Sequence, residues 1–273
     1  MLRTVFWFLY RATRAAVECA PIIPENGTGI ILRFVIASGL AKKKVFALKI
    51  AGRDVLLRSA TPDAKTAVAN LTNEFAIVAE HIPSDARLIV DAGGYIGTSA
   101  LYFAKAFPKA TVVVLEPSAE NLEILRQNVA GVERIVVIEK ALSATAAVVP
   151  LIDTGTGEWG YSIAADAARS GHNLLGQSVE TTTLREVLAV THAQRIDLLK
   201  LDIEGSEREL LAEGPSALAA VDALVCELHE RISHGATRAT MVATEGWRDF
   251  AAGGEKIFCL RPPVATCIGP VEA

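Results

Sequence analysis

The sequence predicts an α/β domain with a doubly wound, mostly parallel sheet, preceded by a small N-terminal extension of helices and a short hairpin. From residue 87 onward, apolar runs typical of buried strands alternate with amphipathic helical segments, the pattern of a parallel sheet covered by helices. The 273 residues, 51% of them hydrophobic, suffice for one large domain and a modest extension. We therefore divide the chain into an extension, residues 1–80, and a domain, residues 81–273.

The composition excludes some classes of partner. The formal net charge of −4 argues against a nucleic-acid partner, which usually shows as a basic face. The cysteines lack C-x-x-C spacing and a neighbouring histidine cluster, so a zinc site is not expected. They are Cys19, Cys226, Cys259 and Cys267. These features together favour a cytoplasmic protein.

The first 16 residues form an apolar segment that includes Phe6, Trp7, Phe8 and Leu9, with Arg11 and Arg14 behind them. The segment is too short and too interrupted for a signal peptide or a spanning helix. One interpretation is an amphipathic helix at a membrane surface, which would make the protein peripheral to the membrane. The other is a helix packed on its own domain or on a second subunit of a homo-oligomer.

The remainder of the extension has three recognisable parts. Residues 30–40 form a second apolar segment, and residues 45–50 and 55–57 are expected to be strands of a hairpin. Residues 64–81 are expected to form a helix. This order predicts a small folded unit in front of the main domain.

A strand, a glycine turn and a helix follow at residues 88–107. The apolar strand contains Asp91 near its end, and Gly93, Gly94 and Gly97 then lead into an amphipathic helix that begins near Thr98. Glycines allow positive φ and close approach of the backbone to a ligand, and the first amides of the helix are free donors. This unit predicts a binding site for a nucleotide-containing cofactor.

The next unit indicates which cofactor is bound. Residues 110–115 form a second apolar run that ends at Glu116, where a carboxylate can bind both hydroxyls of a ribose. The glycine order differs from the G-x-G-x-x-G of dinucleotide sites. A cofactor with a nucleoside and an amino-acid tail needs no pyrophosphate site, so the pattern favours S-adenosylmethionine.

The later elements complete the expected sheet. Strands are expected at residues 135–138, 148–152, 196–201 and 223–225, with an antiparallel edge pair at 257–260 and 265–268. Thr183 and Glu186 form a capping box that begins a helix, and residues 206–212 are expected to form another. Residues 143–180 are glycine-rich and contain Trp159 and Tyr161, which suits either a lid beside the acceptor or a surface excursion.

Three segments resemble the FkbM-type S-adenosylmethionine-dependent methyltransferases. They are residues 90–97, residues 115–128 and residues 197–207, the last containing Lys200, Asp202, Glu204 and Glu207 in the order K-x-D-x-E-G-x-E. A weaker match at residues 57–63 extends the resemblance to roughly residues 45–230. It departs from the family at Tyr95, where Asn is common, and at Phe75, where Tyr is common.

The resemblance implies a class I methyltransferase (Rossmann-like) fold and transfer of a methyl group to oxygen. Typical acceptors in the family are sugars, glycolipids and polyketide-type natural products, so we expect a small-molecule, glycan or glycolipid acceptor. The N-terminal region is expected to help close the site. Residues expected to bind the cofactor are Asp91, Gly93, Gly94, Tyr95, Gly97, Thr98, Glu116, Pro117, Asn121, Lys140, Ala141 and Asp202.

Acidic residues at the ends of two later strands are the catalytic candidates, because a hydroxyl acceptor must lose its proton during attack. The candidates are Asp202, Glu204, Glu227 and His229, with Asp202 expected nearest to the methyl donor. The same carboxylates could hold Mg²⁺, which would lower the pKa of acceptor hydroxyls. Alternatively, Lys200, Glu204 and Glu207 form an ion-pair network that only fixes the loop.

Two other functions fit parts of the pattern. An NAD-dependent oxidoreductase would use the same strand-turn-helix unit and Glu116, but it has no use for the motif from Lys200 to Glu207. A non-catalytic interaction protein on a methyltransferase-like scaffold would not need the glycine turn or its acidic partners. Methyl transfer is therefore the preferred hypothesis.

Overall fold

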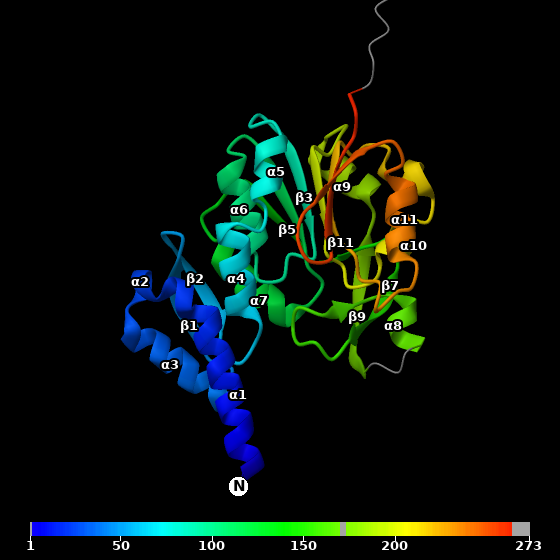
Figure 1. The fold of residues 1–273 in the computed structure, drawn as a ribbon. Coiled ribbons are helices and arrows are strands. Elements are labelled where there is room, and N and C mark those ends of the chain that lie inside the picture. Colours follow the sequence, from blue (N-terminus) through cyan, green and yellow to red (C-terminus); the bar gives the residue numbers. More distant parts are fainter. Residues whose placement is uncertain (1, 170–172, 264–273) are drawn as a thin grey trace, which may run out of the picture.

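A computed structural model describes residues 2–169 and 173–263. Figure 1 shows the N-terminal extension beside a larger α/β domain, with α1 projecting away from the rest. The helices are α1 (Leu2–Cys19), α2 (Ile23–Asn26), α3 (Thr28–Gly39), α4 (Asp63–Thr72), α5 (Ala76–His81), α6 (Thr98–Ala106), α7 (Ala119–Val129), α8 (Ala165–Arg169), α9 (Leu184–Thr191), α10 (Glu207–Leu210) and α11 (Ala236–Ala243). Short 3₁₀ turns, η1 (Ala20–Ile22) and η2 (Gly214–Leu218), follow α1 and α10.

A seven-stranded sheet forms the centre of the domain. Its strands are β3 (Leu88–Ala92), β4 (Thr111–Leu115), β5 (Ile135–Ile138), β10 (Leu198–Leu201), β11 (Ala223–Glu227), β12 (Arg248–Ala251) and β13 (Lys256–Leu260). The order is β12-β13-β11-β10-β3-β4-β5. Pairing is parallel from β11 to β5, whereas β13 is antiparallel to both β11 and β12. This is the class I methyltransferase-like fold with a mostly parallel sheet that the sequence predicted.

The strand order reverses between β3 and β10. The chain runs from β3 outward to β5 and later returns to place β10 on the other side of β3. In open α/β sheets, ligands bind beyond the carboxyl ends of the strands at such a switch point. The topology therefore places the site next to the glycine turn that follows β3.

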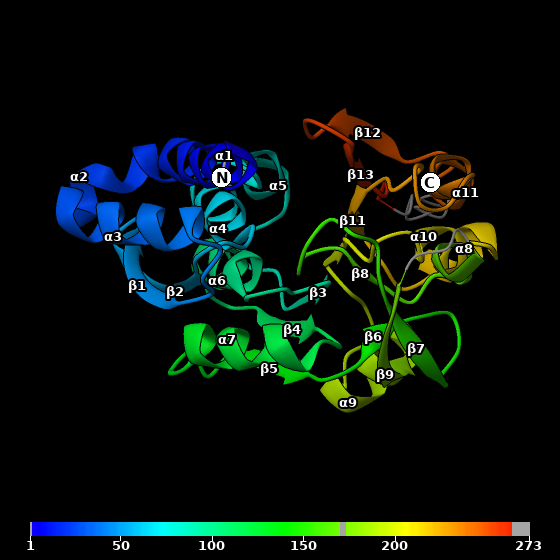
Figure 2. The same cartoon turned by 90° about the horizontal axis from the view of Figure 1, so that it is seen from below.

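Helices cover both faces of this sheet, because side chains along each strand alternate between two cores. Ile89 of β3 belongs to the core under α5, α6 and α7, and Val90 belongs to the core under α9, α10 and α11. Figure 2 shows α6 and α7 on one side of the sheet and α10 and α11 on the other. With both faces buried, the central strands consist almost entirely of apolar residues, as the sequence showed.

The N-terminal extension packs against the part of the domain that carries the glycine turn. Its hairpin is made of β1 (Val45–Ile50) and β2 (Arg53–Arg58), in agreement with the sequence prediction. Buried residues of α1, α3, α4 and this hairpin form one core with Tyr95, Ile96 and Ile124 of the domain. A shared core couples the extension to the site, while the boundary at residue 80 stays a prediction.

The glycine-rich stretch from residue 143 to 180 is more regular than the sequence suggested. A four-stranded sheet, ordered β6-β9-β7-β8, is built from β6 (Ala141–Leu142), β7 (Val148–Asp153), β8 (Tyr161–Ser162) and β9 (Asn173–Thr182). The strand expected at residues 148–152 is confirmed as part of β7, which pairs with β9 with a register shift between Pro150 and Ile152. Helix α8 follows β8 within this segment.

Two further boundaries differ from the expected ones. The single helix expected at residues 64–81 is divided into α4 and α5 by a break at residues 73–75. Strand β13 confirms the edge strand expected at 257–260, but its partner is β12, and residues 265–268 lie outside the described residues. Within the described part of the chain, every helix is too short or too polar to cross a bilayer.

Candidate active site

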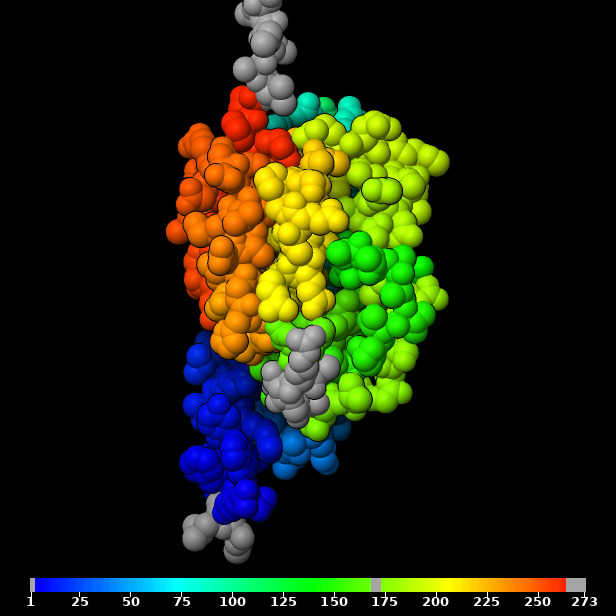
Figure 3. Space-filling model, turned by 90° about the vertical axis from the view of Figure 1, so that its right-hand side faces the viewer, coloured from blue at the N-terminus to red at the C-terminus, as the bar shows by residue number. Residues whose placement is uncertain are grey.

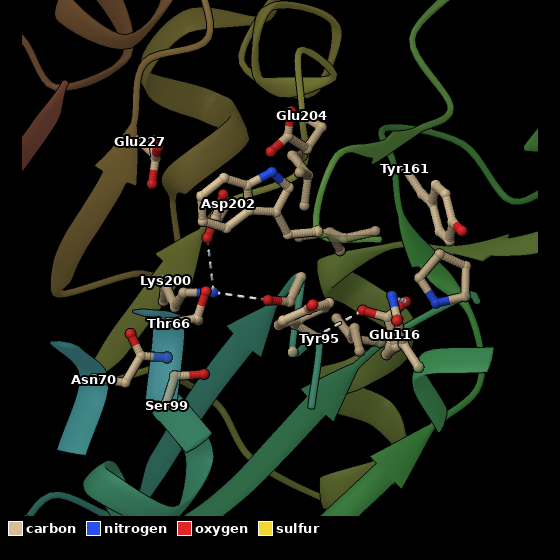
Figure 4. A pocket seen from close by; sticks show the side chains of 18 of the residues that line it. Thr66, Asn70, Tyr95, Ser99, Glu116, Tyr161, Lys200, Asp202, Glu204 and Glu227 are labelled. Atoms are coloured by element: carbon tan, nitrogen blue, oxygen red, sulfur yellow. Dashed lines mark hydrogen bonds and ion pairs between the residues drawn. The ribbon is translucent and has the colours of Figure 1, made fainter. Parts of the chain in front are cut away.

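A cavity lies at the carboxyl ends of the central strands (Figure 4). Its lining includes residues that follow β3, β4 and β10 and the last residue of β11. Of the residues expected to form the site, ten line this cavity: Gly93, Gly94, Tyr95, Glu116, Pro117, Asn121, Ala141, Asp202, Glu204 and Glu227. The structure therefore brings together in space residues that lie more than 130 positions apart in the sequence.

The glycine turn lies against the exit of β10 with no room for a side chain. Gly93 has φ +82°, and a Cβ added there would lie 1.8 Å from the carbonyl oxygen of Asp202. A Cβ on Gly94 would lie 2.1 Å from Cγ1 of Val114. The turn needs glycine for space at both positions and for backbone conformation at Gly93.

The contacts of Tyr95 explain why a tyrosine can stand where Asn is common in the family. Its φ is +50°, in the left-handed region that Asn tolerates better than most residues. The Tyr95 hydroxyl donates a hydrogen bond to Asp63, whose carboxylate is also paired with Arg58 at 3.0 Å. These contacts connect the glycine turn to the N-terminal extension and offset the cost of the backbone conformation.

Asp91 lies behind the turn and does not line the cavity. Its buried carboxylate lies 3.0 Å from Lys200 Nζ and accepts a hydrogen bond of 2.5 Å from the Ser99 hydroxyl. Lys200 Nζ also donates to the Gly93 carbonyl at 2.8 Å. Burial lowers the pKa of the Lys200 ammonium, but the charges of Asp91 and Asp202 outweigh burial. The pKa lies above that of an ordinary lysine, so Lys200 stays charged.

Glu116 is held by donors from the two loops beside it. Its carboxylate accepts backbone N–H groups of Tyr95 and Ser118, each at 2.9 Å, and the side-chain amide of Asn121 at 3.3 Å. Burial raises the pKa of Glu116 to about 7, against the lowering effect of these hydrogen bonds. The carboxylate is thus fixed in direction, and its charge is sensitive to pH near neutrality.

Three carboxylates gather around His229 on the other side of the cavity. His229 Nε2 lies 3.4 Å from Glu204 Oε1, 3.7 Å from Asp202 Oδ1 and 3.8 Å from Glu227 Oε1. Burial lowers the pKa of His229, but Glu204 and Glu207 raise it to about 11. With its ring 1% exposed, His229 lies beneath the carboxylates and does not line the cavity.

Glu207 fixes the loop that presents these carboxylates. It accepts the backbone N–H groups of Ile203 at 3.1 Å and Gly205 at 2.9 Å, and it lies 2.8 Å from His229 Nδ1. Glu204 has φ +50° between them, a costly conformation for a residue other than glycine. The structure thus contains ion pairs of all three residues considered from the sequence: Lys200 pairs with Asp91, and Glu204 and Glu207 both pair with His229. Glu204 also lines the cavity.

The carboxylates differ in their protonation. Burial raises the pKa of Glu204, and the nearby His229 only partly offsets this. Burial also acts to raise the pKa of Asp202, but Lys200 and His229 outweigh it and lower the pKa. Glu227 is paired with Lys256 at 2.7 Å. Glu204 is therefore a stronger base than Asp202.

One group of ligand atoms has spacing suited to a metal ion. Asp202, Glu227 and His229 each offer one such atom, and all three lie within 4.8 Å of one another. His229 Nε2 is buried without a hydrogen-bond partner among the described residues, and its Nδ1 is held by Glu207. A carboxylate on the second ring nitrogen is the usual support of a metal-binding histidine. Because the pKa of His229 is raised to about 11, the ring must lose a proton before it can bind a cation.

Helix α4 supplies a wall that the sequence analysis missed. Lys65, Thr66 and Asn70 line the cavity from the extension. Lys65 Nζ lies 4.6 Å from the ring centre of Trp159, which lines the cavity from the segment between β7 and β8. The side-chain amide of Asn121 donates to the carbonyl of Glu158 at 2.9 Å. The extension and the small sheet thus enclose the cavity together.

Three expected cofactor residues besides Asp91 lie outside the cavity lining. Lys140 pairs with Glu180 at 2.7 Å. Its neighbour Ala141 lines the cavity, but Lys140 does not. A Cβ on Gly97 would lie 2.9 Å from Cγ1 of Val129, so this glycine serves the packing of α6 on α7. Thr98 is buried and hydrogen-bonds the side-chain amide of Asn70 at 2.9 Å. None of these three residues therefore contributes to the cavity lining.

The sequence model of the FkbM methyltransferase domain matches residues 91–251, which include the glycine turn, Glu116 and the acidic cluster. The chain belongs to the FkbM methyltransferase family. Methyltransferase sdnD from Sordaria araneosa is 28% identical over 159 residues, covering 48% of this chain and 61% of that protein. The FkbM family therefore accounts for the three motifs that the sequence analysis identified.

Two solved structures are similar in arrangement. The FkbM methyltransferase from Methylobacillus flagellatus KT has a TM-score of 0.45 at 12% identity, covering 91% of this chain and 59% of that one. Aeropyrum pernix fibrillarin, solved with natively bound S-adenosylmethionine, has a TM-score of 0.40 at 10% identity, covering 80% and 81%. The present chain spans less than two-thirds of the length of both the sdnD protein and the Methylobacillus protein.

Proposed function

We propose that the protein transfers a methyl group from S-adenosylmethionine to a hydroxyl oxygen of a small-molecule, glycan or glycolipid acceptor. The observation that carries this proposal is the arrangement of Glu116 and Glu204 in one cavity. Glu116 lies on one side beside the glycine turn, and the carboxylates Asp202, Glu204 and Glu227 lie on another (Figure 4). The cavity thus contains a carboxylate suited to bind a nucleoside, Glu116, and a carboxylate suited to accept a proton, Glu204.

The cofactor would be held by groups of complementary chemistry. The fixed carboxylate of Glu116 suits the two ribose hydroxyls, and Ala141 and Leu142 offer an apolar surface beside it for the adenine. The polar side chains of Thr66 and Asn70, with the ammonium of Lys65, suit the amino-acid tail. When bound, the sulfonium supplies an activated methyl group.

We assign the role of proton acceptor to Glu204. As the acceptor oxygen forms its bond to the methyl carbon, the bond from that carbon to sulfur breaks, and the hydroxyl proton passes to Glu204. Burial raises the pKa of Glu204, and its Oε2 has no hydrogen bond within the described chain. His229 acts as a positioning residue, because its ring is covered by the carboxylates.

Asp202 is better suited to orientation than to proton removal. Its Oδ2 lies 3.5 Å from Lys200 Nζ, and the lowered pKa makes its carboxylate a weak base. Its position at the exit of β10, against Gly93, supports the expectation that it lies near the methyl donor. Alignment of donor and acceptor can contribute about 7–11 kcal/mol to such a displacement, so orientation is itself a substantial contribution.

The proposal includes a magnesium ion bound by the cluster of Asp202, Glu227 and His229. Asp202, Glu227 and His229 would hold it, with His229 in its neutral form, and when bound it would lower the pKa of an acceptor hydroxyl. We expect Mn²⁺, added as a paramagnetic probe, to give the electron paramagnetic resonance spectrum of a bound ion that Glu227→Gln weakens. A spectrum of free Mn²⁺ at every protein concentration would remove the metal from the proposal.

Tritium-labelled S-adenosylmethionine and a panel of sugars, glycolipids and hydroxylated natural products test the transfer. Alkali-stable label in a hydroxyl-bearing product supports the proposal, and label on an amine would redirect it to nitrogen. Cofactor binding without labelled product for any acceptor would favour the interaction-protein hypothesis. Family membership leaves the NAD-dependent oxidoreductase hypothesis without support.

A further inference from the structure

Helix α1 has one buried face and one exposed apolar face. Ala15 and Cys19 are buried in the core of the extension, and a Cβ on Gly39 of α3 would lie 2.6 Å from the Phe8 ring, which shows how closely the helices pack. The opposite face carries Phe6, Leu9, Tyr10 and Val17, with exposed fractions of 62%, 57%, 53% and 68%. The helix thus packs on its own domain, as one interpretation of the sequence expected, and still leaves an apolar face in contact with water.

Arginines lie along one margin of this apolar face. At 100° per residue, Arg3 and Arg14 fall beside Tyr10 and Val17, between them and the face that packs on α3. Arg11 lies on the same side, with its guanidinium 5.8 Å from the ring centre of Trp7. Glu18 is the acidic residue of α1, and its carboxylate is paired with Arg14 at 2.7 Å. The margin of the exposed face is therefore cationic.

The position of α1 makes this face accessible to a large flat partner. Figure 1 shows α1 extending away from the domain, and Figure 3 shows the N-terminal segment projecting beyond the rest of the surface. Trp7 and Tyr10, whose rings are 5.7 Å apart, lie on or beside the apolar face. Aromatic side chains of this kind favour the boundary between lipid headgroups and acyl chains.

We propose that the exposed face of α1 docks the protein on the surface of an anionic lipid bilayer. Phe6, Leu9, Tyr10 and Val17 would enter the boundary of the acyl region, and Arg3, Arg11 and Arg14 would contact the headgroup phosphates. Such binding is peripheral, with the helix axis parallel to the bilayer. A second copy of the chain suits this face less well, because it would bring the same arginines and not the opposite charge.

Vesicle flotation with the full chain tests the proposal. Vesicles of phosphatidylcholine with phosphatidylglycerol are compared with vesicles of phosphatidylcholine alone. We expect the protein to float with the anionic vesicles, and the double variant Phe6→Ser and Leu9→Ser to bind at least about tenfold less, since both apolar contacts are lost. Arg3→Gln with Arg14→Gln should remove the dependence on anionic lipid and on salt.

A matched control removes exposed apolar side chains elsewhere. Met241 and Val242 of α11 are 57% and 48% exposed, and Met241→Ser with Val242→Ser should bind vesicles like the wild type. Circular dichroism of each variant checks that the fold is kept. Absence of flotation, or flotation unchanged in the Phe6→Ser and Leu9→Ser variant, would overturn the proposal. So would sedimentation showing a dimer that this variant dissociates and that does not bind vesicles.

Discussion

Lys200 and Asp91 form a buried ion pair of 3.0 Å between adjacent strands β10 and β3. Their register places them directly opposite each other, at the point where the strand order reverses. The pair supports the glycine turn from below, because the same ammonium also reaches the Gly93 carbonyl. The ion pair thus has a structural role, because it holds the glycine turn that forms one wall of the cavity.

Breaking this pair should destabilise the fold. Lys200→Met leaves the carboxylate of Asp91 buried without its cation, and we expect the free energy of unfolding in urea to fall by about 3–5 kcal/mol. The double variant Asp91→Asn with Lys200→Met removes both charges and should recover a large part of that loss. A double variant as unstable as the single one would show that the ion pair is not the cause.

Gly93 should tolerate no side chain. Gly93→Ala places a Cβ against the carbonyl oxygen of Asp202, so we expect the turn to shift and S-adenosylmethionine binding to weaken by at least about tenfold. Gly131→Ala is a matched control, because Gly131 has φ +78° and no atom within 4 Å of an added Cβ. Equal losses in the two variants would point to backbone strain alone, and calorimetric binding curves distinguish these outcomes.

Cofactor affinity should depend on the protonation of Glu116. Ribose hydroxyls donate best to the ionised carboxylate, and its pKa of about 7 means that protons compete with the ligand below neutrality. We expect the dissociation constant to be about tenfold larger at pH 6 than at pH 8. Glu116→Gln should weaken binding and remove this dependence on pH. A profile equally steep in Glu116→Gln would assign the effect to another group.

The same group affects stability in the opposite direction. Its pKa in the folded protein lies above the 4.5 of an ordinary glutamate, so the folded state binds the proton more tightly than the unfolded state. The contribution of Glu116 to the free energy of unfolding therefore falls as pH rises from about 4.5 to about 7. The loss of stability that accompanies ionisation of Glu116 is consistent with a carboxylate that is kept to bind the cofactor.

Glu204 should affect turnover more than binding. Glu204→Gln keeps the size of the side chain but cannot accept the proton, so we expect kcat to fall by about 10²–10⁴-fold with little change in cofactor affinity. Glu209→Gln, at an exposed position on the following helix, is the control and should leave kcat unchanged. Retention of full activity in Glu204→Gln would return the assignment to Asp202 or Glu227.

Local sequence patterns predicted the parts of the site that are built from neighbouring residues. Gly93 and Gly94 follow directly on β3, and Glu116 follows directly on β4, so the alternation of strands and turns was enough to place them at one edge of the sheet. The three-part FkbM pattern added the carboxylates at the end of β10. These features depend on short-range geometry, which sequence reveals well.

Residues brought in by tertiary packing were not predictable in the same way. Thr66 and Asn70 line the cavity because α4 packs against α6, and the sequence signal was only their spacing of four on one helical face. His229 lies two residues after Glu227, but its ring turns beneath the carboxylates instead of into the cavity. Lys140 is outside the cavity lining and its side chain pairs with Glu180, while its neighbour Ala141 lines the cavity.

Calorimetric titration of the wild-type protein with S-adenosylmethionine, S-adenosylhomocysteine and NAD⁺ tests the central claim most directly. We predict binding of both adenosyl ligands at one site per chain, weakened in Glu116→Ala, and no binding of NAD⁺. Binding of NAD⁺ alone, or of none of the three ligands, would contradict a cavity built for a methyl donor.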